Sequence, residues 1–120
     1  MAENAAFADA AGFSLPYTSD MPSTHREMHT TLTAIAGRTS EALIGSGVTN
    51  PITRDSTVFA SAFASLSEDT GGRVFVGVGC GDSALKNSGS HPAKLNELKA
   101  FIIAVRSPRA KGLRSASAIE

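Results

Sequence analysis

Short apolar segments typical of strands alternate with longer segments of helical periodicity along most of this chain. Helical patterns cover residues 2–11, 23–36, 55–70 and 92–106. Strand patterns cover residues 13–17, 42–44 and 74–78. The repeat of roughly 30 residues is the length of a βαβ unit. The sequence therefore predicts an α/β fold with about three parallel strands and four helices.

The clearest strand pattern runs directly into a glycine-rich loop. Residues 74–78 are mostly β-branched or aromatic, which indicates a strand buried on both faces, as in a parallel sheet. Gly77, Gly79 and Gly81 then remove side chains where this strand ends. A ligand can approach the backbone closely at such a place.

Each helix is expected to turn one apolar face toward the sheet. The inward-facing residues predicted by helical spacing are Met28, Leu32 and Ile35, then Phe59, Ala62, Phe63 and Leu66, and finally Leu95, Leu98, Ile102 and Val105. Ser23 or Thr24 is predicted to cap the second helix, and Asp55 or Ser56 the third. Pro16 cannot donate a hydrogen bond to a neighbouring strand, so the first strand is expected at an edge of the sheet.

Composition narrows the classes of function. The 11 Lys and Arg residues balance 11 Asp and Glu residues, so no overall field attracts nucleic acid or an anionic membrane. Cys80 is the only cysteine, which excludes an internal disulfide and a cysteine-rich zinc site. The sequence has no signal peptide and no apolar run long enough to span a bilayer, so we expect a cytoplasmic protein without a metal.

Polar residues follow all three predicted strands. Asp20 follows the first strand, residues 47–50 follow the second, and residues 80–83 follow the third. The carboxyl ends of parallel strands meet at one rim of the sheet, where sites of α/β proteins lie. We therefore expect one functional site formed by these three segments.

Three segments in this order, at residues 17–20, 45–51 and 71–83, resemble the luciferase-like flavin- or deazaflavin-dependent oxidoreductases. The similarity is greatest to the methylenetetrahydromethanopterin reductase-like branch, and residues 87–98 also resemble it. The resemblance implies a (β/α)8 barrel that binds FMN or coenzyme F420 and acts on a small-molecule substrate. This chain supplies strands two to four of that barrel, within a partial domain at residues 1–106, and residues 107–120 are predicted to form a loose tail.

The resemblance also implies roles for individual residues. The Gly47–Val48 bond matches the place of a non-prolyl cis peptide that backs the flavin ring. The carboxylates matching the family's acidic strand ends, and predicted as catalytic, are Asp20 and Asp82. The predicted cofactor-binding residues are Gly47, Val48, Thr49, Asn50, Gly81, Asp82 and Ser83. Met21 stands where some members carry histidine. Because most of the barrel is missing, the resemblance further implies weak cofactor binding by this chain alone, and a homo-oligomer or a complementing chain.

Simpler structural roles are open for several of these residues. Asp82 and Ser83 suit a helix N-terminus, and Asp20 before Met21 and Pro22 suits a turn. Residues 49–51 form an ordinary turn sequence.

Four further polar residues also have ordinary explanations. Cys80 is expected to be a small buried residue rather than a nucleophile. Arg54 is expected to be an exposed residue at a helix start, although it could meet an anionic substrate. His25 and His29 lie four apart, but without a third ligand they indicate a solvated helix face rather than zinc.

Two other functions remain open at the level of sequence. Residues 76–82 superficially resemble the first glycine-rich motif of S-adenosylmethionine-dependent methyltransferases. That motif usually has an acidic residue where Gly77 stands, and residues 93–106 have helical periodicity where a strand bearing a ribose-binding acid is expected. The other alternative is a non-catalytic barrel remnant or interaction subunit.

Overall fold

The structure, a computed structural model, describes residues 1–107. The elements are α1 (Ala2–Ala10), β1 (Tyr17–Thr18), α2 (Met28–Ala36), β2 (Ile44–Thr49), α3 (Ser56–Asp69), β3 (Val74–Val78), α4 (Asp82–Asn87) and α5 (Leu95–Arg106). Apart from Ser107, the predicted loose tail lies outside the described residues. The predicted alternation of helices and strands is confirmed, with five helices in the described part rather than four.

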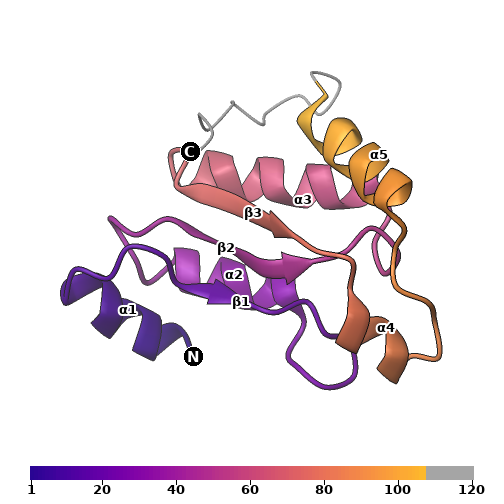
Figure 1. Ribbon diagram of the computed structural model, residues 1–120. Coiled ribbons are helices and arrows are strands. Elements are labelled where there is room, and N and C mark those ends of the chain that lie inside the picture. The colour runs from indigo at the N-terminus through magenta and orange to yellow at the C-terminus, as the bar shows by residue number, and fades with distance from the viewer. Residues whose placement is uncertain (108–120) are drawn as a thin grey trace.

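The three strands form one parallel sheet in the order β1-β2-β3, which confirms the predicted topology (Figure 1). β1 is an edge strand, as Pro16 indicated, and it pairs Tyr17 with Gly45. β2 pairs with β3 from Ile44 opposite Val74 to Thr49 opposite Val78. The register shifts between Ser46 and Thr49, so the end of β2 is irregular where it enters the predicted site.

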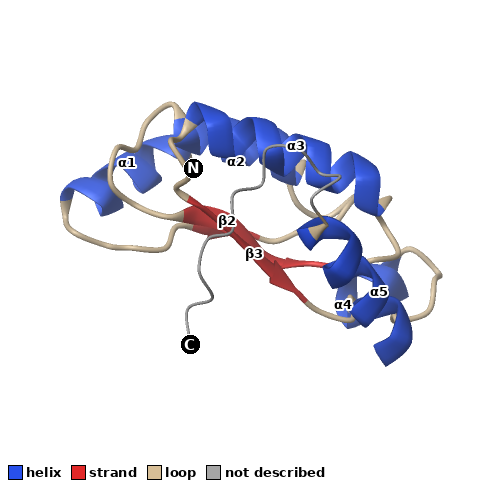
Figure 2. Cartoon of the chain, turned by 90° about the horizontal axis from the view of Figure 1, so that it is seen from above, coloured by secondary structure: helices blue, strands red, loops and turns tan. Residues whose placement is uncertain are grey.

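The hydrophobic core lies between the sheet and the helices that run along one of its faces (Figure 2). Phe59 and Phe63 on α3 stack with ring centroids 4.5 Å apart, and both are fully buried. Phe101 on α5 packs against Phe59 at 5.3 Å. Among the predicted inward residues, Ala62 is half-buried, and six are buried: Met28, Leu32, Ile35, Phe59, Phe63 and Leu66. Apolar periodicity was therefore a reliable guide for α2 and α3.

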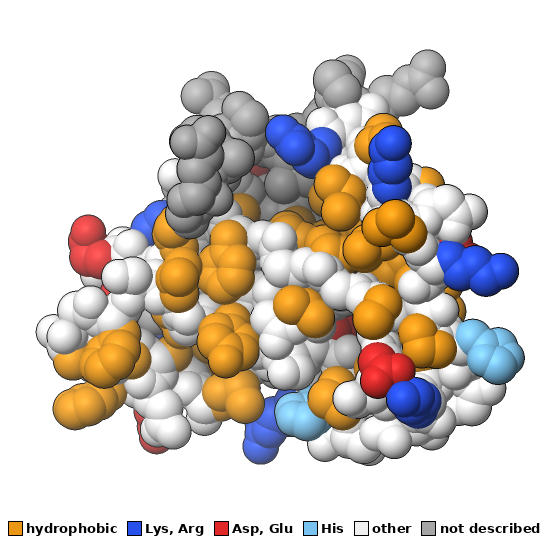
Figure 3. All heavy atoms as spheres, in the orientation of Figure 1, with side chains coloured by type: hydrophobic (Ala, Val, Ile, Leu, Met, Phe, Trp, Pro, Cys, Tyr) orange, Lys and Arg blue, Asp and Glu red, His pale blue; other side chains and the backbone are white. Residues whose placement is uncertain are grey.

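The opposite face of the sheet, formed by Tyr17, Gly45, Gly47, Phe75 and Gly77, is called the bare face below. Val74, Val76 and Val78 pack on the helix side, so strand alternation turns the residues between them to this face. No helix within residues 1–107 runs along it, and hydrophobic side chains lie exposed there (Figure 3). Tyr17, for example, is 62% exposed.

The first strand is shorter and begins later than predicted. Phe13 and Leu15 lie outside it and are largely exposed, and only Tyr17 and Thr18 pair with β2. Pro16 lacks an N–H group and contributes only its carbonyl oxygen, which accepts from Gly45 N at 3.4 Å. The proline therefore shortens the strand as well as placing it at the edge.

The second helix also starts later than predicted. Neither Ser23 nor Thr24 caps it; Glu27 is the N-cap, and its side chain accepts a hydrogen bond from Thr30 N. The carbonyl of Met21 instead accepts from the backbone of Thr24 and His25, which closes a turn before the helix. Asp55 caps α3 as predicted, through bonds from Thr57 N and Val58 N.

The predicted fourth helix is α5, and a short helix that was not predicted, α4, precedes it. α4 begins at Asp82, directly after the glycine-rich loop, and α5 begins at Leu95, three residues after Pro92. Leu95 is 81% exposed and Ile102 is also exposed, which contradicts their predicted inward positions. Val105 is buried as predicted and Leu98 is half-buried, and Phe101 is buried as well, where α5 contacts α3.

Candidate functional site

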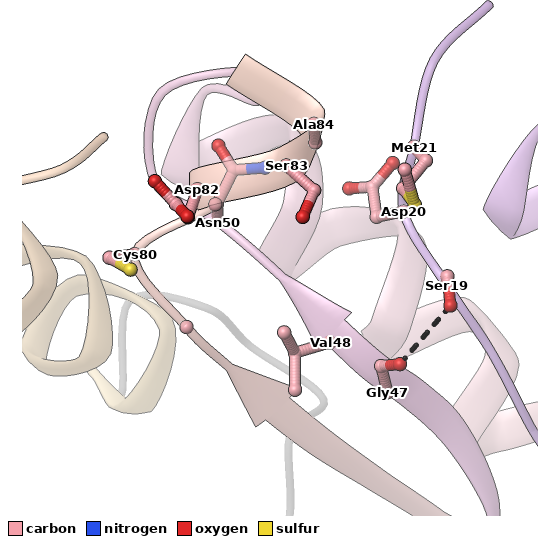
Figure 4. A pocket seen from close by; sticks show the side chains of 12 residues that line it. Ser19, Asp20, Met21, Gly47, Val48, Asn50, Cys80, Asp82, Ser83 and Ala84 are labelled. Carbon is pink, nitrogen blue, oxygen red and sulfur yellow. Dashed lines mark hydrogen bonds between the residues drawn. The ribbon is translucent and has the colours of Figure 1, made fainter. Parts of the chain in front are cut away.

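A cavity of about 290 Å³ lies at the carboxyl ends of the strands (Figure 4). Its walls come from the three segments that the sequence places at one rim. The lining residues are Ser19, Asp20, Met21, Gly47, Val48, Asn50, Gly79, Cys80, Gly81, Asp82, Ser83 and Ala84. The structure thus brings together every predicted site residue except Thr49.

The peptide bond between Gly47 and Val48 is cis, as the resemblance implied. The Val48 side chain is 48% exposed and forms an apolar part of the cavity wall (Figure 4). It lies over β3, since a Cβ atom at Gly79 would approach its Cγ2 to 2.9 Å. Ser19 Oγ donates to the Gly47 carbonyl at 3.3 Å, which ties the ends of β1 and β2 together. The wall at this point is therefore backbone plus one aliphatic side chain.

Asn50 and Gly81 fit against each other between β2 and α4. The Asn50 side chain is almost fully buried, and its Oδ1 accepts from Ile52 N and Thr53 N, both at 3.0 Å. Gly81 has a φ of +78°, and a Cβ atom there would lie 2.7 Å from Asn50. Glycine is required at this position for both reasons. Asn50 builds the turn after β2 with its oxygen and meets the cavity with the rest of its amide.

Asp20 lies at the end of β1 with its side chain 2% exposed. Its Oδ2 accepts from Thr49 Oγ1 at 2.7 Å and from Arg54 Nε at 2.7 Å, and its Oδ1 accepts from Arg54 Nη2 at 2.9 Å. Thr49 is fully buried and does not line the cavity, because its hydroxyl group is turned toward this carboxylate. Both oxygens of Asp20 are thus engaged within the protein.

Asp82 has a different environment from Asp20. Its side chain is 56% exposed and pairs with Lys86 one helical turn on, at 2.9 Å. It is the first residue of α4 but not its cap, a position taken by Gly81. Cys80 is exposed and lines the cavity, so the prediction that it is a small buried residue is wrong. Asp82, Ser83 and Cys80 are the polar groups on the open side of the cavity.

Two residues outside the predicted site are less exposed than the sequence suggested. The Arg54 side chain is only 19% exposed, because it inserts between Asp20 and Glu27. His29 is also 19% exposed and packs edge-on against Phe59 and Phe63, so the predicted solvated face is wrong for it. Burial, followed by the charge of Arg54, lowers the pKa of His29. Asp20 and Arg54 are 34 residues apart in the sequence, and no local sequence pattern predicts an ion pair over that separation.

Glu27 contributes to stability in a pH-dependent way. Burial raises the pKa of its carboxyl group, but hydrogen bonds from the Thr30 and His29 backbone and from Arg54 outweigh burial and lower the pKa from 4.5 to about 2. Because the folded-state pKa is depressed, this stabilisation is complete above pH 4.5 and is lost as the pH falls toward 2. The side chain is 49% exposed, so solvent screening keeps the effect small.

We expect Glu27→Gln to flatten the decline in unfolding free energy with falling pH through the same interval. Urea unfolding at stepped pH values measures this decline. Parallel curves for the two proteins across that interval would contradict the expectation.

Within residues 1–107 no group of three His, Cys, Asp or Glu side chains is arranged to hold a metal ion. No helix in the same part of the chain has the length and apolar character needed to cross a membrane.

A model of the luciferase-like monooxygenase family matches residues 1–107. The chain is 38% identical over 84 residues to 5,10-methylenetetrahydromethanopterin reductase of Methanolobus tindarius, covering 70% of this chain and 26% of the relative. The solved coenzyme F420-dependent tetrahydromethanopterin reductase of Methanopyrus kandleri is 31% identical with a TM-score of 0.67, over 74% of this chain and 27% of that one. The structure of a type II Baeyer-Villiger monooxygenase of Pseudomonas putida, solved with FMN, is 20% identical with a TM-score of 0.71. The match covers 87% of this chain and 32% of that one.

These proteins are all much longer than this chain, which spans about a quarter to a third of each. The resemblance seen in the sequence is confirmed, and so is the partial barrel. The match includes the glycine-rich segment at residues 76–82, which it assigns to this family rather than to the methyltransferases.

Proposed function

The chain belongs to the luciferase-like monooxygenase family, and we propose that it forms part of the cofactor site of a flavin- or F420-dependent oxidoreductase. The observation that carries the proposal is the cavity at the strand ends, with the cis Gly47–Val48 bond in its wall. The F420-dependent reductase of Methanopyrus kandleri, at 31% identity, supports a cofactor of this class.

The residues of the cavity fit the ring system of FMN or F420. Ligand sites are mostly apolar with a few placed polar groups, and here Val48 and the backbone of Gly47 face the polar side chains of Asp82 and Ser83. We propose that Gly47, Val48, Asn50 and Gly81 form the surface against which the ring lies. Asp82, with its exposed carboxylate, meets the polar edge of the ring or the substrate.

The bound cofactor supplies hydride chemistry, and the protein supplies position and electrostatics. Met21 lines the cavity where some family members carry histidine, so this chain has no imidazole there for proton transfer. Among the lining residues, Asp20, Asp82 and Cys80 are the groups that can ionise. We propose a reaction on a small-molecule substrate that relies on Asp82 rather than on a histidine.

The cavity of about 290 Å³ is at the lower limit for an enclosed small-molecule site. Residues 1–107 form walls on one side only, and the bare face carries exposed apolar side chains. We propose that further strand–helix units, from a second copy or a complementing chain, cover this face in the working enzyme. A non-catalytic role as an interaction subunit is the alternative outcome, and the predicted cytoplasmic location remains a prediction.

Fluorescence titration with FMN and with F420 tests the proposal directly. We expect one of them to bind weakly, and we expect Val48→Asp to weaken binding by about tenfold because a carboxylate replaces the apolar wall beside the ring. Val58→Asp is the matched control, since Val58 is 64% exposed on α3 and away from the cavity.

If Val48→Asp and Val58→Asp bind the cofactor with equal affinity, the cofactor ring does not lie against Val48. If neither this chain nor its complex with further strand–helix units binds either cofactor, the oxidoreductase proposal is wrong. The non-catalytic role as an interaction subunit is then the one that remains.

A further inference from the structure

Arg54 joins three segments of the fold from a position behind the cavity. It lies in the loop between β2 and α3, and it is not among the residues that line the cavity. Its Nε and Nη2 both donate to Asp20, and Nη2 also donates to Glu27 Oε1 at 2.7 Å. A guanidinium group suits this arrangement because its donors lie in a rigid plane that matches a carboxylate.

The carboxylate that Arg54 holds is connected to both sides of the irregular end of β2. Asp20 Oδ2 accepts from Thr49 Oγ1, and the backbone N–H of Asp20 donates to the Val48 carbonyl at 3.3 Å. Ser19, the preceding residue, donates to the Gly47 carbonyl. The residues that follow β1 are therefore hydrogen-bonded to three consecutive residues of β2, Gly47, Val48 and Thr49. The first two of these line the cavity.

The charges argue against a ligand-binding role for Arg54. One guanidinium group faces two carboxylates, Asp20 and Glu27, so the cluster has no positive charge left to attract an anionic substrate. The hydrogen bond with Asp20 raises the pKa of Arg54 above its ordinary value; burial opposes this rise, and the charges of Asp20 and Glu27 add to it. Arg54 therefore stays charged, and its donors stay directed at Asp20.

We propose that Arg54 is a positioning residue, which holds Asp20 so that the ends of β1 and β2 form a fixed wall of the cavity. In this role Asp20 is a structural acceptor and transfers no proton. Its carboxylate is nearly inaccessible, and both oxygens already accept hydrogen bonds. Asp82 is then left as the ionisable carboxylate that faces the cavity and solvent.

Amide hydrogen exchange tests the positioning role without any cofactor. In Arg54→Ala we expect the amides of Asp20 and Gly79, which bond to the carbonyls of Val48 and Thr49, to exchange at least about tenfold faster. Arg54→Lys should restore part of the protection against exchange, because an ammonium group keeps the charge but cannot pair with both carboxylate oxygens as the planar guanidinium does. Arg38→Ala is the matched control, since Arg38 is exposed and outside the cluster.

Protection of α3 and α5 amides reports whether each variant is folded. If Arg54→Ala fails to fold, Arg54→Lys and Asp20→Asn carry the test, because both keep side chains of similar size. A double variant of Arg54→Lys with Asp20→Asn should show little more than the larger single effect, since both changes break one pair. Unchanged protection at Asp20 and Gly79 in folded variants would overturn the proposal, as would additive effects in the double variant.

The consequence for cofactor binding rests on the proposed function and is measured separately. If the wild-type chain binds FMN or F420, we expect about tenfold weaker binding in Arg54→Ala, partly recovered in Arg54→Lys. If neither the wild-type chain nor its complex with further strand–helix units binds a cofactor, the proposed function fails, while the exchange measurement still decides the role of Arg54.

Discussion

Phe59→Ala is expected to destabilise the domain by about 3–5 kcal/mol, which is typical of removing a fully buried aromatic ring. Phe59 has no exposed surface, and its ring contacts Phe63, Phe101 and His29. The cavity left behind would lie between α2, α3 and α5, where no small movement can fill it. Small domains have a total stability of about 5–15 kcal/mol, so this one substitution would remove a large share of it.

Val58→Ala provides the control for this prediction in the same helix. Val58 is the preceding residue on α3 and is 64% exposed, so its loss is expected to change stability by no more than about 0.5 kcal/mol. Chemical denaturation followed by circular dichroism measures both variants on the same scale. A loss below about 1 kcal/mol for Phe59→Ala would show that the aromatic cluster is not the centre of the core.

Gly45→Ala is expected to cost about 3 kcal/mol for a different reason, namely a collision rather than a cavity. A Cβ atom at Gly45 would overlap the backbone carbonyl oxygen of Phe75 and lie 2.9 Å from its Cδ1. Gly45 is paired with Phe75 in the sheet, so relief requires β2 and β3 to separate. We therefore expect loss of stability and also a change in the shape of the cavity, because the same two strands end there.

Gly37→Ala separates this collision from the general effect of replacing glycine. The φ of Gly37 is −69°, and an added Cβ atom would meet only backbone oxygens at 3.8 and 3.9 Å. Alanine should stabilise the chain there by about 0.4–1 kcal/mol, through the lower entropy of the unfolded state. Thermal unfolding of the two variants should move in opposite directions, and movement in the same direction would contradict the steric argument.

The architecture could be predicted because it depends on local periodicity and on rules of connection. Apolar spacing identified the inward faces of α2 and α3, and Pro16 placed β1 at the edge. Helix boundaries were less predictable where turn chemistry competes, as at Met21, whose carbonyl closes a turn that delays α2. The short helix α4 was missed because a helix of six residues has too little periodicity to detect.

The location of the candidate site could be predicted from the sequence, but the hydrogen-bond network around Asp20 could not. The strand ends identified the rim, and the family resemblance identified the cis bond at Gly47. The partners of Asp20 could not be predicted, since Thr49 and Arg54 meet it only after β1 and β2 have paired. Distant pairs of this kind depend on tertiary contact, which a single sequence does not reveal.

The glycines of the bare face limit how this protein can be redesigned. At Gly45, Gly47 and Gly77 an added Cβ atom would strike a neighbouring strand or the Tyr17 ring. A protein engineer therefore cannot introduce side chains at these three positions, because each substitution would disturb the sheet itself. Side chains that can be exchanged without entering the sheet lie in the loops after β1 and β3, around Met21 and Cys80, where they already reach the cavity.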